Sequence, residues 1–275
     1  MKYLTRALSA LLFLGLAGTA SAGWRDWRDW GDWKYWIGAH DFNVPDVDSH
    51  TYGVTVGASV EKTTSAGRHL IGSMDLFADR DKDDLDPDHI PIRWDVHLGA
   101  DQEFWKGGLA HLGWTADFNT RMNTVSSIER QMIAMPALVG WLDGDHVRAS
   151  LKTGAGWFFL EIDDDVPKTR GYDRSDFRNS TLSYTGAADI LIRAGSHCRI
   201  HGGAQEWWDD SGDWLQKQLQ ASLHVDVDNW KKDSEVVLSV DAYEYNLEVY
   251  QRPGEPAILP WDNDVLVRLT FRTHM

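Results

Sequence analysis

Serine, histidine and carboxylate side chains are the groups of this chain best suited to covalent chemistry. Ser222 and His224 are two residues apart, which places both on the same face if the segment is a β-strand. A serine hydrolase needs its nucleophile and its base within hydrogen-bond reach, but alternate residues of a strand are about 7 Å apart. We therefore expect this pair to be too far apart to react unless a third group from elsewhere completes a site.

Metal and cofactor chemistry has weaker support. An acidic stretch places Asp79, Asp81 and Asp83 at alternate positions, as calcium loops do, but Asp84 and Ile90 stand where an EF-hand has glycine and glutamate. A weak calcium or magnesium site and a solvated acidic loop are both open interpretations, and the loop is favoured. The sequence has no zinc-type spacing, phosphate-binding loop or dinucleotide motif, so we predict no cofactor and do not favour an enzyme.

Charged residues of both signs recur at every second position of several segments, between apolar residues. In residues 92–101, for example, Trp94 and Val96 alternate with Arg93 and Asp95. This period of two predicts strands with one apolar and one hydrated face. The hydrated faces would carry Asp75, Arg93, Asp95, His97, Asp117, Arg121, Arg148, Lys152, Asp189, Arg193, Arg199, His201, Asp241 and Arg268. We expect many of them to pair across neighbouring strands, and the set to line a hydrated path for small polar solutes.

The elements that must position these residues are about twelve strands. We expect them near residues 35–42, 51–62, 68–79, 91–104, 109–121, 127–142, 146–162, 180–194, 198–208, 214–228, 235–251 and 263–275. Their connections alternate between tight turns and mostly longer segments. An even strand number with short turns at one end is the pattern of a closed, antiparallel transmembrane β-barrel.

Three irregularities interrupt the alternation. Residues 132–141 and 157–160 are apolar on both faces, which predicts an apolar patch inside the barrel, packed against an internal segment or open to an apolar ligand. Pro136 lacks the N–H of a strand ladder, so we expect a bulge or locally broken pairing there. The apolar phase of residues 236–249 shifts, and a bulge near Tyr243 would keep the apolar side chains outside.

The N-terminal region has the features of an export signal. Basic residues precede an apolar run, and Ala20, Ser21 and Ala22 supply a small-residue cleavage pattern. We expect a signal peptide at residues 1–22, a Trp-rich segment at 23–34 and the barrel domain at 35–275. The Trp-rich segment is predicted to lie amphipathically at the membrane interface or to enter the barrel base, and a sugar-stacking strip is the alternative.

Composition limits the partners and the cross-links. The chain has 42 acidic and 27 basic residues and a formal net charge of −15, which argues against nucleic acid as a partner. Cys198 is the single cysteine, so the chain forms no internal disulfide. A membrane-spanning helix needs about 18 consecutive apolar residues, and no run after the signal approaches this length.

In pattern, the chain resembles Gram-negative outer-membrane β-barrel proteins of the twelve-stranded size class. The last strand keeps its apolar phase to the end of the chain, although the class usually ends on an aromatic residue and this chain ends on Met275. The resemblance implies a location in the cell outer membrane and contact with its lipid, with lipopolysaccharide and with the assembly machinery.

The function expected from these features is a narrow channel or conduit for small polar solutes. An outer-membrane lipid-active enzyme, an acyl hydrolase or transferase with a lumenal site, is the alternative. A third interpretation is a soluble exported β-barrel or sandwich that binds a ligand.

Overall fold

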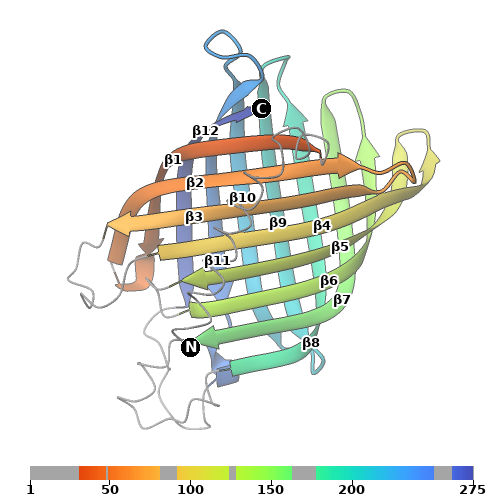
Figure 1. The fold of residues 1–275 in the computed structure, drawn as a ribbon. Coiled ribbons are helices and arrows are strands. Elements are labelled where there is room, and N and C mark those ends of the chain that lie inside the picture. The colour runs from red at the N-terminus through yellow and green to blue at the C-terminus, as the bar shows by residue number, and fades with distance from the viewer. Residues whose placement is uncertain are drawn as a thin grey trace, which may run out of the picture.

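A single closed sheet accounts for the structure, a computed structural model that describes residues 31–47, 49–80, 92–123, 128–162, 178–250 and 262–274. Twelve antiparallel strands pair in chain order, and β1 pairs with β12 to close the barrel (Figure 1). This confirms the predicted fold class. The strands are β1 Asp32–Val44, β2 Ser49–Thr63, β3 His69–Arg80, β4 Ile92–Gly107, β5 Ala110–Asn123, β6 Ile128–Asp143, β7 Val147–Ile162, β8 Arg178–Arg193, β9 Cys198–Asp209, β10 Trp214–Asp226, β11 Ser234–Tyr245 and β12 Asn263–His274.

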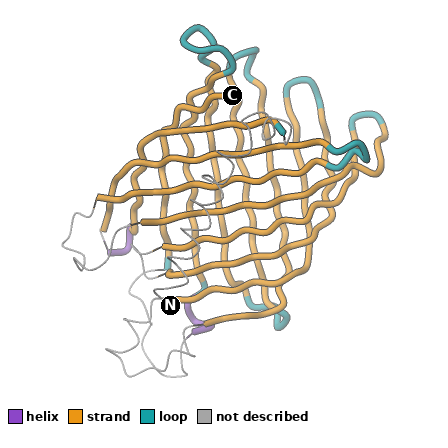
Figure 2. The backbone as a smooth tube through the Cα atoms, in the orientation of Figure 1, coloured by secondary structure: helices purple, strands orange, loops and turns teal. Residues whose placement is uncertain are grey.

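The two ends of the barrel differ in their connections. Tight turns such as those after β2 and β8 join the strands at one end, which we call the turn end (Figure 2). Gly67 and Gly195 have φ angles of 75° and 79° in these turns, a region that glycine adopts without steric cost. The strand ends that flank residues 81–91, 163–177 and 251–261 lie at the other end, which we call the loop end.

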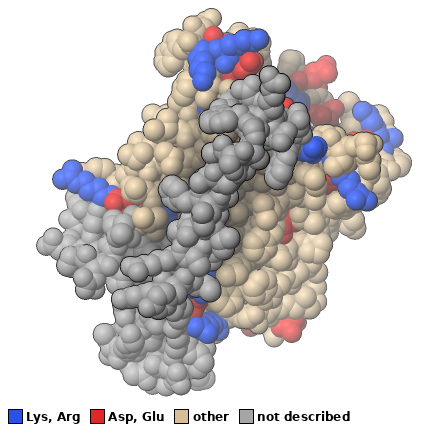
Figure 3. Space-filling model, viewed as in Figure 1, with Lys and Arg blue, Asp and Glu red and all other residues tan. Residues whose placement is uncertain are grey.

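The apolar face of the sheet points outward. Large apolar side chains such as Ile37, Leu98, Leu138 and Leu269 are exposed on the outer wall. On the face seen in Figure 3, charged residues gather mainly toward the two ends, and the wall between them is mostly uncharged. This geometry does not fit a soluble barrel or sandwich, because such folds bury their apolar faces in a shared core. Within the described ranges, no helix is long and apolar enough to span a membrane.

The interior at the loop end is apolar, as the two-faced segments predicted. Ile133 and Met135 of β6 and Phe158 and Leu160 of β7 belong to one buried hydrophobic cluster, the loop-end cluster. Its other members are Phe42, Val44, Phe77, Ile162, Trp207, Leu215, Tyr245, Leu247, Tyr250 and Leu266. Two of these lie in the short 3-10 helix η4, Leu247–Tyr250, which follows β11 and contacts β8. The apolar patch is therefore packed against an internal segment.

Pairing is broken at Pro136, which is one of the two expected outcomes, and no bulge forms there. The ladder between β6 and β7 pairs Ala134 with Trp157 and next pairs Ala137 with Gly154, so the two residues between are unpaired on this side. The register is the same before and after the gap. Proline therefore interrupts the hydrogen bonds without shifting the neighbouring side chains to the other face.

The bulge expected near Tyr243 is wrong. β11 pairs in unbroken register with both β10 and β12 as far as Glu244, and β11 ends at Tyr245 rather than at residue 251. Tyr243 and Tyr245 consequently face the interior, where the two rings stack at a centroid distance of 6.3 Å. The two tyrosines face the interior because their hydroxyl groups form hydrogen bonds inside the barrel, and lipid offers no such partners.

The Trp-rich segment is in part a strand. β1 begins at Asp32, so Trp33 and Trp36 belong to the barrel wall. Because they are three positions apart in the strand, they lie on opposite faces. Trp33 stacks on Tyr35, while Trp36 donates a hydrogen bond of 2.6 Å to the lumenal Asp75. Trp24, Trp27 and Trp30 lie outside the described residues.

Candidate functional site

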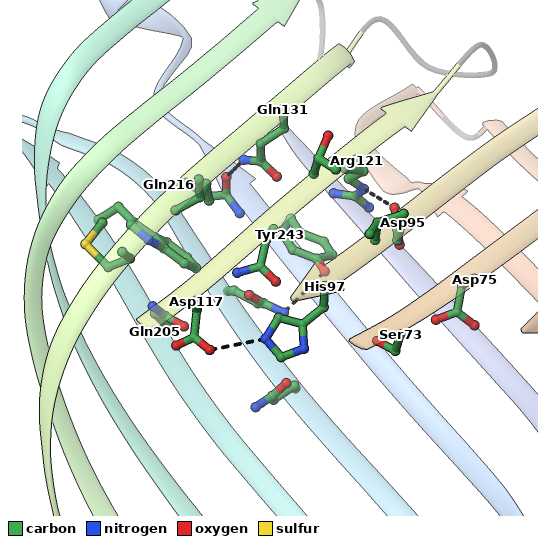
Figure 4. A pocket seen from close by; sticks show the side chains of 18 of the residues that line it. Ser73, Asp75, Asp95, His97, Asp117, Arg121, Gln131, Gln205, Gln216 and Tyr243 are labelled. Atoms are coloured by element: carbon green, nitrogen blue, oxygen red, sulfur yellow. Dashed lines mark hydrogen bonds and ion pairs between the residues drawn. The ribbon is translucent and has the colours of Figure 1, made fainter. Parts of the chain in front are cut away.

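A polar cavity of about 360 Å³ lies inside the barrel, on the turn side of the loop-end cluster (Figure 4). Its wall is formed by eight of the twelve strands, which are β3 to β7 and β9 to β11. Its ionisable lining residues are Asp75, Asp95, His97, Asp117, Arg121 and Lys152, and its amides are Asn119, Gln131, Gln205, Gln216, Gln218 and Gln220. The cavity thus offers hydrogen-bond donors and acceptors together with charges of both signs.

One side of the cavity is organised around Asp117 of β5. His97 Nε2 on β4 lies 3.1 Å from Asp117 Oδ1, and Lys152 Nζ on β7 lies 3.6 Å from Oδ2. Thr115 Oγ1 donates a further hydrogen bond of 3.1 Å to the same carboxylate. Both oxygens of Asp117 are therefore engaged, and its contacts link β5 to the neighbouring β4 and, across β6, to β7 on the lumenal face.

Arg121 of β5 lies between the cavity and the loop-end cluster. Its guanidinium donates a hydrogen bond of 2.8 Å to the Tyr245 hydroxyl of β11, which itself donates to Asp264 of β12 at 3.0 Å. Asp95 and Asp264 lie 3.8 and 3.6 Å from the guanidinium, and the ring of Tyr243 lies 4.2 Å from it. Because β5 and β11 are not neighbours, this network crosses the lumen.

A second bridge narrows the lumen at a similar position. The Gln131 amide of β6 donates a hydrogen bond to the Gln216 amide of β10, and these strands also belong to different parts of the wall (Figure 4). Contacts between opposite walls leave space for small molecules only. The described interior is therefore narrow where the polar cavity meets the loop-end cluster.

Three side chains close to the loop end form a buried triad. Asp79 of β3 accepts two hydrogen bonds of 3.2 Å from Arg93 of β4, and His40 Nε2 of β1 lies 2.8 Å from it. The Arg93 guanidinium also lies 4.1 Å from the ring centroid of Phe42. This triad holds three strands together and is shielded from solvent.

The expected lining residues fall into four groups. Asp75, Asp95, His97, Asp117, Arg121 and Lys152 line the polar cavity, and His201, Asp241 and Arg268 line a second cavity of about 220 Å³. Arg93 is buried in the triad. Arg148, Asp189, Arg193 and Arg199 face inward toward the turn end, where Arg193 pairs with Asp143 and Arg199 with Glu235. That these residues conduct solute is still a prediction.

Three glutamines of β10 were not among the predicted lining residues. Gln216, Gln218 and Gln220 alternate along β10 in the phase of Ser222, so the period of two already placed them inside. A search restricted to ionisable groups passes over them. Tyr243 was not among the predicted residues either, because the bulge expected near it interrupted the phase of the strand there.

Of the three candidate metal ligands, the structure describes one. Asp79 is committed to His40 and Arg93, whereas Asp81 and Asp83 lie outside the described residues. In the part of the chain that the structure describes, no three His, Cys, Asp or Glu side chains form a group able to hold a metal ion.

The expectation that Ser222 and His224 are too far apart is wrong. Ser222 Oγ and His224 Nε2 are 3.1 Å apart, and His224 Nδ1 is 3.1 Å from Glu235 Oε2 of β11. The backbone spacing of about 7 Å does not limit the pair, because side chains on one face of a strand lean along it and reach each other. Glu235 supplies the third group from elsewhere.

Comparisons with known proteins identify the fold. The sequence matches no protein-family model and no curated protein sequence. Among solved structures, it is similar to an outer-membrane channel from Pseudomonas putida F1, with a TM-score of 0.53, 9% identity and coverage of 89% of this chain and 96% of that chain. The NanC porin has a TM-score of 0.50, 10% identity and coverage of 88% and 100%. Outer membrane phospholipase A from Escherichia coli has a TM-score of 0.44, 11% identity and coverage of 88% and 92%. The chain thus has the twelve-stranded fold of outer-membrane barrels.

Proposed function

We propose that the protein is a channel of the cell outer membrane that passes small polar solutes slowly through its lumen. The observation that carries this proposal is the polar cavity of about 360 Å³. Its size fits small solutes. Its lining suits molecules that exchange several hydrogen bonds, since amides both donate and accept.

The pairing of the lining charges favours weak ion selectivity. Asp117 is balanced by His97 and Lys152, and Arg268 faces Asp75 and Asp241 at 3.5 and 2.8 Å. Because no single sign dominates, we infer a path that accepts neutral and zwitterionic solutes as readily as ions.

The loop-end cluster sets the expected conductance. Packed apolar side chains on the loop side of the cavity oppose the passage of hydrated solutes, and hydrophobic constrictions restrict flow by excluding water. We therefore infer a small unit conductance rather than that of an open pore.

The outer wall supports a location in the membrane. Its exposed apolar residues fit the hydrocarbon of the outer membrane. Lys217 of β10 faces outward toward the loop end, 3.2 Å from Glu244 and 4.0 Å from the centroid of the Trp214 ring. An amine in this position suits the phosphates of lipopolysaccharide. Contacts with lipopolysaccharide and with the assembly machinery are part of the proposal.

Targeted modification in planar bilayers tests the channel. In a Cys198→Ser background the chain has no cysteine, and Gln218→Cys then places one thiol in the polar cavity. A negatively charged methanethiosulfonate reagent should lower the step current of this variant. Leu219→Cys is the matched control, because Leu219 is at nearly the same depth but is outward-facing and 62% exposed.

Two results would contradict the channel. One is the absence of current steps from purified protein that migrates as a folded, heat-modifiable band. The other is equal sensitivity of the Gln218→Cys and Leu219→Cys variants to the reagent, since current would then not pass by the cavity.

A further inference from the structure

Ser222, His224 and Glu235 have the contacts of a nucleophile, a base and an orienting acid. Each successive pair is joined at 3.1 Å, with the imidazole in the middle. Glu235 pairs with Arg199 and faces His224, an environment that favours its carboxylate form. A carboxylate only accepts, so the hydrogen bond between Nδ1 and Glu235 requires the ring proton to be on Nδ1. His224 Nε2 is then free to accept the hydroxyl proton of Ser222, as in a serine hydrolase.

The arrangement is distinct from the other histidine pairs of the lumen. His69, His97 and His111 each face a carboxylate, and among the described residues no serine forms a hydrogen bond with these three rings. Among the described residues, His224 is the histidine that joins a serine to a carboxylate. The register between β10 and β11 explains why Glu235 lies beside His224. His224 pairs with Val237, so Glu235 is its diagonal neighbour on β11.

A cavity provides space for a substrate beside the serine. The second cavity, of about 220 Å³, is lined by Ser222 and His224 and also by Arg268 and Arg272. Ser222 is half-buried, and is therefore accessible from the lumen. Arg268 is engaged by Asp75 and Asp241.

Arg272 supplies a second positive charge. It donates a hydrogen bond of 3.3 Å to Thr270, lies over the ring of Trp36 and is opposite Glu235 in the ladder between β11 and β12, with no carboxylate of the described residues within 4 Å. Negative charge that develops on a carbonyl oxygen in this cavity would be stabilised by its guanidinium.

We propose that Ser222, His224 and Glu235 form a serine esterase site in the lumen, which hydrolyses small carboxylic esters. Ser222 Oγ attacks the carbonyl carbon while its proton passes to His224 Nε2. The C–O bond to the alcohol then breaks, and the alcohol leaves with that proton. Water attacks the acyl group on Ser222 and gives a proton to Nε2, which returns it to Oγ as the acyl–Oγ bond breaks. The net reaction converts an ester and water into a carboxylic acid and an alcohol.

The test uses the full-length protein, folded in detergent. p-Nitrophenyl acetate reports hydrolysis, and a fluorophosphonate reagent followed by mass spectrometry locates the reactive serine. We expect a label on Ser222, loss of label and a fall to background hydrolysis in Ser222→Ala, and a rate about a hundredfold lower or more in Glu235→Gln, which can no longer stabilise the imidazolium. Ser150→Ala is the control, because Ser150 faces the Asp189 carboxylate at 3.5 Å and has no histidine contact.

Failure of the esterase proposal can be distinguished from failure of the channel proposal. Ser222→Ala should keep its heat-modifiable migration and its bilayer conductance while it loses hydrolysis. Absence of both label and hydrolysis in the unmodified protein would overturn the site, and so would a rate in Ser222→Ala equal to that in Ser150→Ala.

Discussion

Removal of the Asp79 carboxylate should destabilise the barrel more than removal of any surface carboxylate. The side chains of Asp79 and His40 are fully buried, and that of Arg93 is 2% exposed. Asp79→Ala deletes the acceptor of both Arg93 hydrogen bonds and of the contact with His40. It therefore leaves a guanidinium without its counter-ion in a site that water does not reach.

The magnitude follows from these contacts. Removing one partner of a buried ion pair costs about 3–5 kcal/mol, chiefly because the other charge stays buried and unpaired. The rings of Phe42 and Phe77 remain at 4.1 and 5.0 Å from the guanidinium, and contacts of this kind recover about 1–2 kcal/mol. We expect a net loss of about 3 kcal/mol in the free energy of unfolding, which lowers the folding equilibrium constant about a hundredfold.

Urea unfolding in lipid vesicles, followed by tryptophan fluorescence, measures this loss. Asp101→Ala is the matched control, because Asp101 pairs with His69 at 2.9 Å but its side chain is 48% exposed, and such pairs contribute below about 1 kcal/mol. The double variant Asp79→Leu, Arg93→Met removes both charges and should recover most of the loss. If Asp79→Ala unfolds at the same urea concentration as Asp101→Ala, the triad does not stabilise the loop end.

Three further predictions concern the lumen. Leu247→Ala combined with Tyr250→Ala removes two side chains of the loop-end cluster and should raise single-channel conductance, and an unchanged current would show that the cluster does not limit flow. Tyr245→Phe deletes the hydroxyl that contacts Arg121 and Asp264, so urea titration should show a loss of about 1–3 kcal/mol, and no loss would mean that water replaces it. Gly57→Val places a side chain into the ring of Trp36, so the folded fraction on a heat-modifiability gel should fall, and normal folding would show that the indole can move.

Most of the fold could be predicted because the period of two reports directly on which face meets lipid. The face of β4 that carries Arg93, Asp95 and His97 is inside and that of Trp94 and Val96 is outside, in the predicted phase. β11 was harder, since tyrosine suits both a lipid interface and a polar interior. Tyr245 points inward because its hydroxyl forms hydrogen bonds with Arg121 and Asp264 across the lumen. The period of two along one strand does not predict such bonds.

The candidate sites were less predictable for a related reason. The contact between Gln131 and Gln216 depends on the barrel diameter, which brings strands from opposite walls within reach. The approach of Ser222 to His224 depends on rotamers rather than on backbone spacing. Alternation along one strand indicates the face on which a residue lies, but not its partners in three dimensions.

The pairing of β1 with β12 has a consequence for biogenesis. The seam joins the first and last strands of the chain, from Lys34 opposite His274 to Asn43 opposite Val265. A nascent polypeptide that lacks its final dozen residues retains two open edges, each able to recruit a foreign strand. Closure of the barrel therefore requires β12, and a template that occupies both margins until β12 arrives would protect the unfinished sheet from aggregation.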